Sequence, residues 1–221
     1  HKISSISGKL SVLKSFFGWL ANEEIIPKDP TKKIKAPKKE KRLPKALSVG
    51  ELELLRENCK TLRERALLEV FYATGCRLSE LAGMNRNGIN WQRMSYRVLG
   101  KGNKEREVFF SEKAFYHLRK YLMTRTDNED ALFVTERKPY RRMSNRAIQR
   151  EISIIAKRSG INKRIHPHVL RHTFATDLLN NGAELALVQA LMGHEDPSTT
   201  LVYTNITDER KRQAHRQYHA Q

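Results

Sequence analysis

The sequence predicts a mainly α-helical protein with a small antiparallel β-sheet. Apolar residues recur at helical spacing through most of the 221 residues, and only one short region alternates in the manner of strands. The chain is long enough to bury a sizeable core. It contains no run approaching the roughly 20 apolar residues of a transmembrane helix. Two cysteines without a C-x-x-C motif exclude a disulfide framework and a zinc ribbon.

Positive charge dominates the composition. The chain carries 42 Lys and Arg against 24 Asp and Glu, a formal net charge of +18. Such an excess attracts polyanions, so nucleic acid rather than a membrane is the expected partner. A passive ribosome-like binder and a merely soluble basic surface are the alternatives. Cys59 and Cys76 fit reduced thiols in a cytoplasmic, nucleoid-associated protein. There is no secretory signal, and the start at His1 leads us to expect a fragment of a longer chain.

The first predicted element is an amphipathic helix at residues 5–21. Its apolar face consists of Leu10, Leu13, Phe16, Phe17 and Leu20. One helix cannot bury such a face alone. It therefore either packs on the main body or has partner helices in a preceding region. We assign residues 1–27 to the remnant of an N-terminal helical domain.

Residues 28–46 are predicted to form a basic linker. Four of the seven prolines lie at positions 27, 30, 37 and 44, and residues 31–45 contain eight Lys or Arg and one Glu. A solvated tether is one interpretation. We favour a strap along a phosphate backbone, because the charge has one sign and prolines reduce the entropy lost on docking. The expected contacts are Lys38, Lys39, Lys41, Arg42 and Lys45.

Residues 47–221 form the predicted main domain. Ser48 followed by Glu51 is a capping-box signature for its first helix. Three short antiparallel strands are expected at 89–91, 95–99 and 107–110, with a Gly-Lys-Gly-Asn-Lys turn between the last two. Helices are expected at 49–58, 62–74, 78–84, 111–123, 144–158, 169–180, 183–191, 197–203 and 208–219.

Six positions in this domain suit phosphate chemistry: Arg77, Lys101, His168, Arg171, His194 and Tyr203. Two arginines can each hold a phosphate with two parallel hydrogen bonds. Histidine and lysine can move protons, and tyrosine can form a covalent intermediate. Each residue alone also fits an ordinary structural role, so only the whole pattern is informative.

The pattern resembles the tyrosine recombinase (phage integrase) family, and most closely its Xer-type members. The matching segments are Arg77, Lys101 in its hairpin, His168-Val169-Leu170-Arg171-His172, Leu191-Met192-Gly193-His194 and Tyr203. Residues 173–176 and 198–200 also match, and the resemblance covers about residues 44–213. It implies a catalytic domain at 47–221, with residues 1–27 as part of a helical core-binding domain.

The resemblance implies a role for each site residue. Tyr203 would attack a DNA phosphorus and form a 3′-phosphotyrosyl enzyme, which a 5′-hydroxyl later resolves. His168 would accept the tyrosine proton, and Lys101 would protonate the leaving 5′-oxygen. Arg77 and Arg171 would hold the non-bridging oxygens, and His194 would hydrogen-bond the phosphate. Glu80 and His172 would support these groups without contacting the phosphate themselves. No cofactor or ATP is needed.

Other basic residues are expected to contact DNA phosphates, with a solvated surface as the alternative. They are Lys104, Arg141, Arg142, Arg146 and Arg150. A zinc site built from His166, His168, His172 and His194 is disfavoured, because the spacing is not that of a zinc protease and the arginines already supply positive charge.

The expected partners follow from the same resemblance. They are double-stranded DNA with an inverted-repeat site, and three further copies in a homo-tetramer or a hetero-tetramer with a related recombinase. An accessory protein is a further expected partner. The helix at 208–219 would pack into a neighbouring protomer, with packing on its own domain as the alternative. A noncatalytic DNA-binding regulator and a type IB topoisomerase-like enzyme are the competing functions.

Overall fold

The computed structural model describes residues 3–37, 46–100, 105–193 and 208–219. It divides the chain into two compact units, His1–Leu43 and Pro44–Gln221. The first unit contains one long helix, α1 (Ile3–Asn22). Leu13, Phe16 and Trp19 on this helix are exposed, so its apolar face is only partly covered within the described part of this unit. After the helix, Thr31 is buried and its Oγ1 and backbone N–H both bond Asp29 at 2.7 Å.

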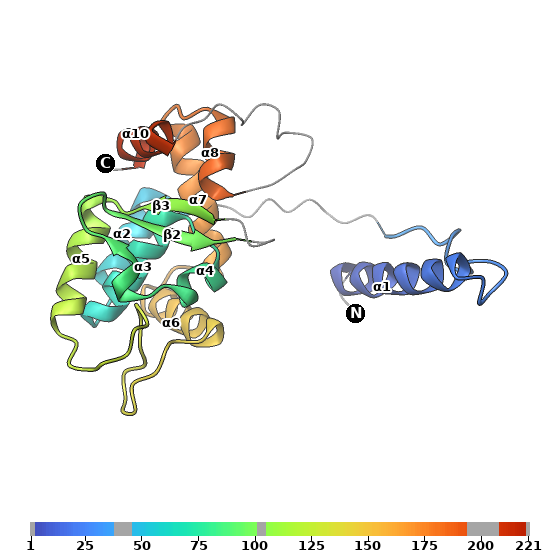
Figure 1. The fold of residues 1–221 in the computed structure, drawn as a ribbon, viewed down its shortest axis with the longest axis horizontal. Helices are drawn as coiled ribbons and strands as arrows, with labels where there is room; N and C mark the ends of the chain where they lie inside the picture. The colour runs from blue at the N-terminus through green and yellow to red at the C-terminus, as the bar shows by residue number, and fades with distance from the viewer. Residues whose placement is uncertain (1–2, 38–45, 101–104, 194–207, 220–221) are drawn as a thin grey trace. The chain divides into compact units, whose positions relative to one another are not determined.

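The second unit is helical around one small sheet, as the sequence predicts (Figure 1). The sheet has the order β1-β2-β3 and is antiparallel throughout. Its strands are β1 (Ile89–Asn90), β2 (Ser95–Leu99) and β3 (Glu105–Phe109). The third strand begins two residues earlier than predicted, because Glu105 and Arg106 continue the ladder opposite Leu99 and Val98.

The helices of this unit mostly begin and end where capping chemistry places them. Ser48 forms the predicted capping box with Glu51 at the start of α2. Serine or threonine side chains also cap α3, α5 and α6. The bounds are α2 (Val49–Glu57), α3 (Leu62–Thr74), α4 (Leu78–Gly83), α5 (Glu112–Met123), α6 (Asn145–Arg158), α7 (Pro167–Asn180), α8 (Leu185–Met192) and α10 (Asp208–His219), with a short 3₁₀ turn at Arg86–Gly88.

Helix α3 is the centre of this unit. It contacts α5, α6, α7 and β3, and nine of its 13 residues are buried. A helix with apolar residues on every side is typical of such a central position. Its apolar side chains belong to the main core, whereas Phe174 and Leu178 of α7 pack with α8 in a second, smaller core. The two cores meet where α3 ends, and this is where the candidate site lies.

Two helix starts in this unit differ from the prediction by two residues. Helix α7 begins at Pro167 rather than at residue 169, because proline suits the first turn and His166 precedes it as the N-cap. Helix α8 begins at Leu185 rather than at residue 183, because Gly182 has a φ of +89° and the Ala183 N–H bonds back to Leu178. The predicted helix at 197–203 lies outside the described residues.

The last helix, α10, packs on its own unit, against α7, α8 and β3. Figure 1 shows it beside α7 and α8 at one end of the unit. His215 is buried there, and its Nε2 lies 2.7 Å from the carbonyl oxygen of Ala73 at the end of α3. This is the alternative arrangement named above, and exchange of the helix between protomers stays a prediction.

Candidate active site

Arg77 owes its position to the way α3 ends. Gly75 closes the helix with a φ of +54°, and a Cβ at this position would overlap the ring of Phe174. Only glycine fits both constraints. Two residues later, Arg77 is the N-cap of α4, and its backbone N–H donates to Glu80 Oε2 at 2.6 Å. The tight turn therefore presents the Arg77 side chain at the surface, where it is 37% exposed.

Arg171 approaches the same place from α7. It is only 6% exposed, and its two Nη atoms donate to the carbonyl oxygens of Gly75 and, at 2.5 Å, of Met192. Burial, together with the nearby charges of Arg106 and Arg77, lowers the pKa of Arg171 to about 10. The guanidinium is therefore still charged at neutral pH.

The end of α8 brings the two arginines together. Arg77 Nη2 donates to the carbonyl oxygen of Gly193 at 2.7 Å, and Arg171 bonds the preceding residue, Met192. Gly193 ends α8 in the left-handed conformation, with a φ of +63°. Two guanidinium groups are thus held at neighbouring carbonyls of one turn, which His194 directly follows in the sequence. All four Nη atoms of the two arginines thus donate to protein oxygens in this structure.

Glu80 is the acidic centre of this group. Its side chain is 2% exposed and accepts hydrogen bonds from Arg77 Nη1 at 3.0 Å and from both Nη atoms of Arg106 at 2.7 Å. Burial alone would raise the pKa of Glu80, but the bonds from Arg106 and Arg77 outweigh it and lower the pKa to about 2. Glu80 therefore holds Arg77 and Arg106 together, and its predicted supporting role in the reaction stays a prediction.

Arg106 is a site residue that was not predicted from the sequence. This side chain is only 11% exposed although it belongs to a surface hairpin. Strand alternation carries the missing signal, because Arg106 lies two residues before the buried Val108 and on the same face of β3. An arginine at a core-facing strand position needs a buried partner, and Glu80 supplies it.

Comparison with known proteins decides the family. The profile of the phage integrase family matches residues 45–210. The tyrosine recombinase XerD of Yersinia pestis is 39% identical, over 99% of this chain and 77% of its own length. The chain belongs to the phage integrase family of tyrosine recombinases. The resemblance inferred from the motifs is thereby confirmed.

Further relatives agree with this assignment. Tyrosine recombinase XerC of Mannheimia succiniciproducens is 39% identical over 97% of this chain and 75% of its own. The crystal structure of XerA recombinase superposes with a TM-score of 0.66 at 28% identity, covering 96% of this chain and 84% of that one. The fold is also that of lambda integrase, as seen in the crystal structure of its dimer bound to a COC′ core site. The TM-score is 0.73 at 18% identity, covering 94% of this chain and 77% of that one.

The histidines on and beside α7 differ in burial. His168 is exposed on the first turn of α7, and its ring centroid lies 6.0 Å from that of His166. His172 is half-buried on the next turn. Burial, then the neighbouring His168 and Arg164, lower the pKa of His166. The role predicted for His168 stays a prediction. Among the described residues, no group of three or more His, Cys, Asp or Glu could hold a metal ion.

Thr173 and Phe174, which the family motif also includes, have structural roles. Thr173 Oγ1 donates to the carbonyl oxygen of Val169 at 2.8 Å and accepts from the backbone N–H of Leu47 at 3.0 Å. It thereby ties the start of the second unit to α7. Phe174 covers Gly75 and holds the turn that presents Arg77.

Several predicted site residues lie outside the described residues. Lys101 and Lys104 belong to the segment between β2 and β3, and His194 and Tyr203 to the segment between α8 and α10. The predicted linker contacts, Lys38, Lys39, Lys41, Arg42 and Lys45, also lie outside. Their roles stay predictions.

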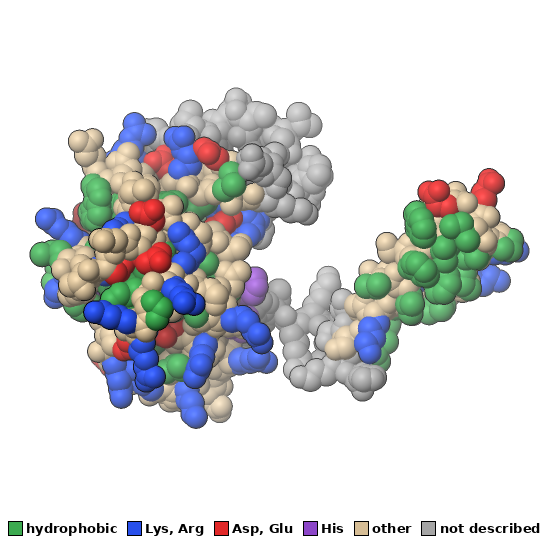
Figure 2. Space-filling model, turned by 60° about the horizontal axis from the view of Figure 1, so that its bottom comes forward, with side chains coloured by type: hydrophobic (Ala, Val, Ile, Leu, Met, Phe, Trp, Pro, Cys, Tyr) green, Lys and Arg blue, Asp and Glu red, His purple; other side chains and the backbone are tan. Residues whose placement is uncertain are grey.

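The predicted DNA-binding arginines around α6 are all exposed. Figure 2 shows Lys and Arg side chains gathered on the face of the second unit that carries α6. Arg141, Arg146 and Arg150 are exposed there. Arg142 is engaged differently, because it donates to the carbonyl oxygens of Ala82 and Met84 at 2.9 Å and to the side chain of Asn85. Part of its hydrogen-bonding capacity thus fixes the loop after α4.

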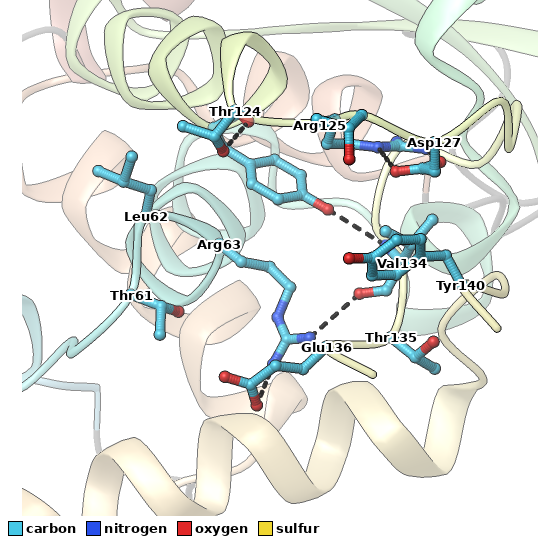
Figure 3. Close-up of a pocket in the computed structure, with 12 residues that line it drawn as sticks. Thr61, Leu62, Arg63, Thr124, Arg125, Asp127, Val134, Thr135, Glu136 and Tyr140 are labelled. Carbon is cyan, nitrogen blue, oxygen red and sulfur yellow. Dashed lines mark hydrogen bonds and ion pairs between the residues drawn. The ribbon is translucent and has the colours of Figure 1, made fainter. Parts of the chain in front are cut away.

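A pocket of about 280 Å³ lies at the opposite end of α3 (Figure 3). Arg63 points into it, and donates to the carbonyl oxygen of Val134 at 3.2 Å and to Glu151 at 2.6 Å. Arg125 binds Asp127 on the far wall. These polar groups hold the loop after α5 in place, and we assign the pocket no chemistry.

No helix in the described part of the chain is long and apolar enough to cross a membrane.

Proposed function

We propose that this protein is a site-specific DNA recombinase that cuts and rejoins DNA through a 3′-phosphotyrosyl intermediate. The observation that carries the proposal is the meeting of Arg77 and Arg171 at the end of α8. The residue that follows this end is His194, and Tyr203 lies in the same segment before α10. Membership of the tyrosine recombinase family supports the same chemistry.

The geometry suits charge stabilisation at a phosphodiester. Arg171 is fixed by two carbonyl bonds, and Arg77 keeps an exposed edge for a substrate oxygen. Preorganised donors of this kind are each worth about a hundredfold to a thousandfold in rate. A free tyrosine with a pKa of about 10 is about one part in a thousand ionised at pH 7, so Tyr203 needs a proton acceptor, for which we propose His168.

The remaining roles complete the proposed reaction. Lys101 protonates the leaving 5′-oxygen, and His194 hydrogen-bonds the phosphate. Glu80 and His172 support the arginines. A 5′-hydroxyl from a partner strand then displaces Tyr203 from the phosphorus, which restores the enzyme and needs no ATP.

We further propose a DNA complex built from several protomers. The DNA carries an inverted repeat, contacted by the basic linker, by Lys104 and by the exposed arginines around α6. The protomers form a homo-tetramer, or a hetero-tetramer with a related recombinase, in which α10 exchanges between neighbours. An isolated protomer is then nearly inactive.

Covalent trapping tests the proposed chemistry. The protein is incubated with nicked, fragmented genomic DNA of its source, and adducts that resist SDS are isolated and sequenced. We expect adducts that cluster at an inverted repeat and vanish in Tyr203→Phe. The matched control is Tyr116→Phe, which alters an exposed tyrosine on α5 and should leave the yield unchanged.

The outcomes separate the competing functions. Tight DNA binding without adducts would leave a noncatalytic regulator on the same fold. A protein that forms adducts and relaxes supercoiled DNA, but never joins two duplexes, would be a type IB topoisomerase-like enzyme. Adducts that persist in Tyr203→Phe would show that another residue is the nucleophile.

A further inference from the structure

Glu80 is the acidic side chain at the point where three arginines gather. Its two oxygens accept four hydrogen bonds: two from Arg106, one from Arg77 Nη1 and one from the Arg77 backbone N–H. Four bonds fill the acceptor capacity of a carboxylate. Arg106 takes both oxygens in a two-pronged pair, whereas the Arg77 side chain touches only Oε1.

Arg106 also reaches the end of α8. Its Nε donates to the carbonyl oxygen of Leu191 at 3.2 Å. A Cβ at Gly193 would come within 2.9 Å of Arg106 Cδ and Nε, so the arginine stem lies directly against this turn. One side chain thus joins β3, the start of α4 and the end of α8.

These three segments carry three of the proposed catalytic groups. Strand β3 begins at Glu105, directly after the turn that contains Lys101. Arg77 is the N-cap of α4, and His194 follows Gly193. Of these three groups, Arg77 is the one that the structure describes, and Arg106 shares its partner Glu80.

We propose that Arg106 is a positioning residue, which occupies both oxygens of Glu80 and so keeps Arg77 free to bind the scissile phosphate. The inference rests on the proposed function. An arginine and a carboxylate prefer two parallel hydrogen bonds. Without Arg106, the Glu80 carboxylate has Arg77 as its remaining guanidinium partner among the described residues. Arg77 then turns toward Glu80, and its charge is neutralised where the phosphate needs it.

The test is single-turnover cleavage of the DNA recovered by trapping, prepared as a nicked duplex. Misplacing a catalytic group by about 1 Å costs about a hundredfold in rate, so we expect Arg106→Met to cleave about a hundredfold more slowly than the unaltered protein. A second substrate carries a methylphosphonate at the scissile position, which removes the negative charge that Arg77 would meet. On that substrate the reduction in rate should shrink to about threefold or less.

A double variant separates charge competition from simple loss of structure. Adding Glu80→Gln to Arg106→Met removes the carboxylate that captures Arg77, so cleavage should recover by about tenfold. The matched control is Arg97→Met. Arg97 pairs with Glu105 on the same hairpin at 3.5 Å, but it is 74% exposed, so its removal should leave the rate unchanged. A crystal structure of Arg106→Met should show Arg77 bonded to both oxygens of Glu80.

Three results would overturn the inference: an unchanged rate in Arg106→Met, an equal reduction on both substrates, or no recovery in the double variant. An Arg77 that stays bonded to one oxygen in the crystal structure would also count against it. Failure of the proposed function is distinct, because the unaltered protein would then cleave neither substrate.

Discussion

Arg171 shows how a single side chain acquires a role that its residue type only permits. Its guanidinium bridges the ends of α3 and α8, and both of these bonds go to backbone carbonyls, those of Gly75 and Met192. A planar fork is needed to reach two carbonyls at once, and lysine has no such fork. Substitution by lysine therefore separates the positive charge from the two-pronged hydrogen-bonding geometry.

Arg171→Lys keeps the positive charge and removes the fork. We expect cleavage of trapped-site DNA to fall by about a hundredfold to a thousandfold, because a preorganised donor is removed while binding through the basic surface remains. Single-turnover cleavage and filter binding measure the two quantities. If the variant cleaved at the normal rate, charge alone would suffice at this position.

At the scale of elements, the docking of α10 is the interaction with a clear pH dependence. His215 and His219 lie on one face of the helix and are buried against Phe174, with Tyr72 packed on His219. Burial lowers the pKa of His215 to about 4, although its bond to Ala73 acts in the opposite direction. Burial and the neighbouring His215 also lower the pKa of His219.

The sign of the effect follows from these directions. Above pH 6.5 both histidines are neutral in the folded and unfolded states, so the docked helix is fully stable. As the pH falls from 6.5 to about 4, His215 becomes protonated in the unfolded state but stays neutral in the folded state. The free energy of unfolding therefore decreases by on the order of 3 kcal/mol. Urea unfolding at pH 7 and pH 5 should show a large part of this decrease.

His215→Gln is the matching variant. Glutamine keeps an N–H that can donate to the carbonyl oxygen of Ala73, but it does not titrate. The decrease in unfolding free energy between pH 7 and pH 5 should therefore be smaller than in the unaltered protein. An equal decrease in both proteins would assign the pH dependence to other groups.

At the scale of the whole molecule, the division into two units predicts separable stability and DNA affinity. The main core is built from side chains of residues 47–170, all of which belong to the second unit. Residues 44–221 produced alone should therefore unfold at the same midpoint temperature as the second unit does in the whole chain. They should bind DNA more weakly and with a shallower dependence on salt, by about 0.9 in slope for each phosphate that is no longer neutralised.

The control for this experiment is the whole chain with Lys38, Lys39, Lys41, Arg42 and Lys45 changed to Gln. If the linker contacts phosphates, the salt slope of this variant and that of the isolated unit should decrease by similar amounts. An unchanged slope in the Gln variant would make the linker a passive tether.

Most of the helices, the hairpin and the candidate reacting groups could be predicted from the order of the residues. Helical periodicity and caps such as Ser48 with Glu51 are local, so they can be found without knowing what lies across the core. The succession of Arg77, Lys101, His168, Arg171, His194 and Tyr203 indicated the family, and the comparisons confirmed it.

How these groups are held depends on the tertiary packing. The pairing of Arg106 with Glu80, the bonds of Arg77 and Arg171 to the end of α8, and the burial of His215 against α3 all join segments that are distant in the sequence. Such contacts depend on how helices pack around α3, and local secondary-structure propensity does not predict them. The candidate chemistry was therefore readable from residue types, whereas the support of that chemistry required the fold.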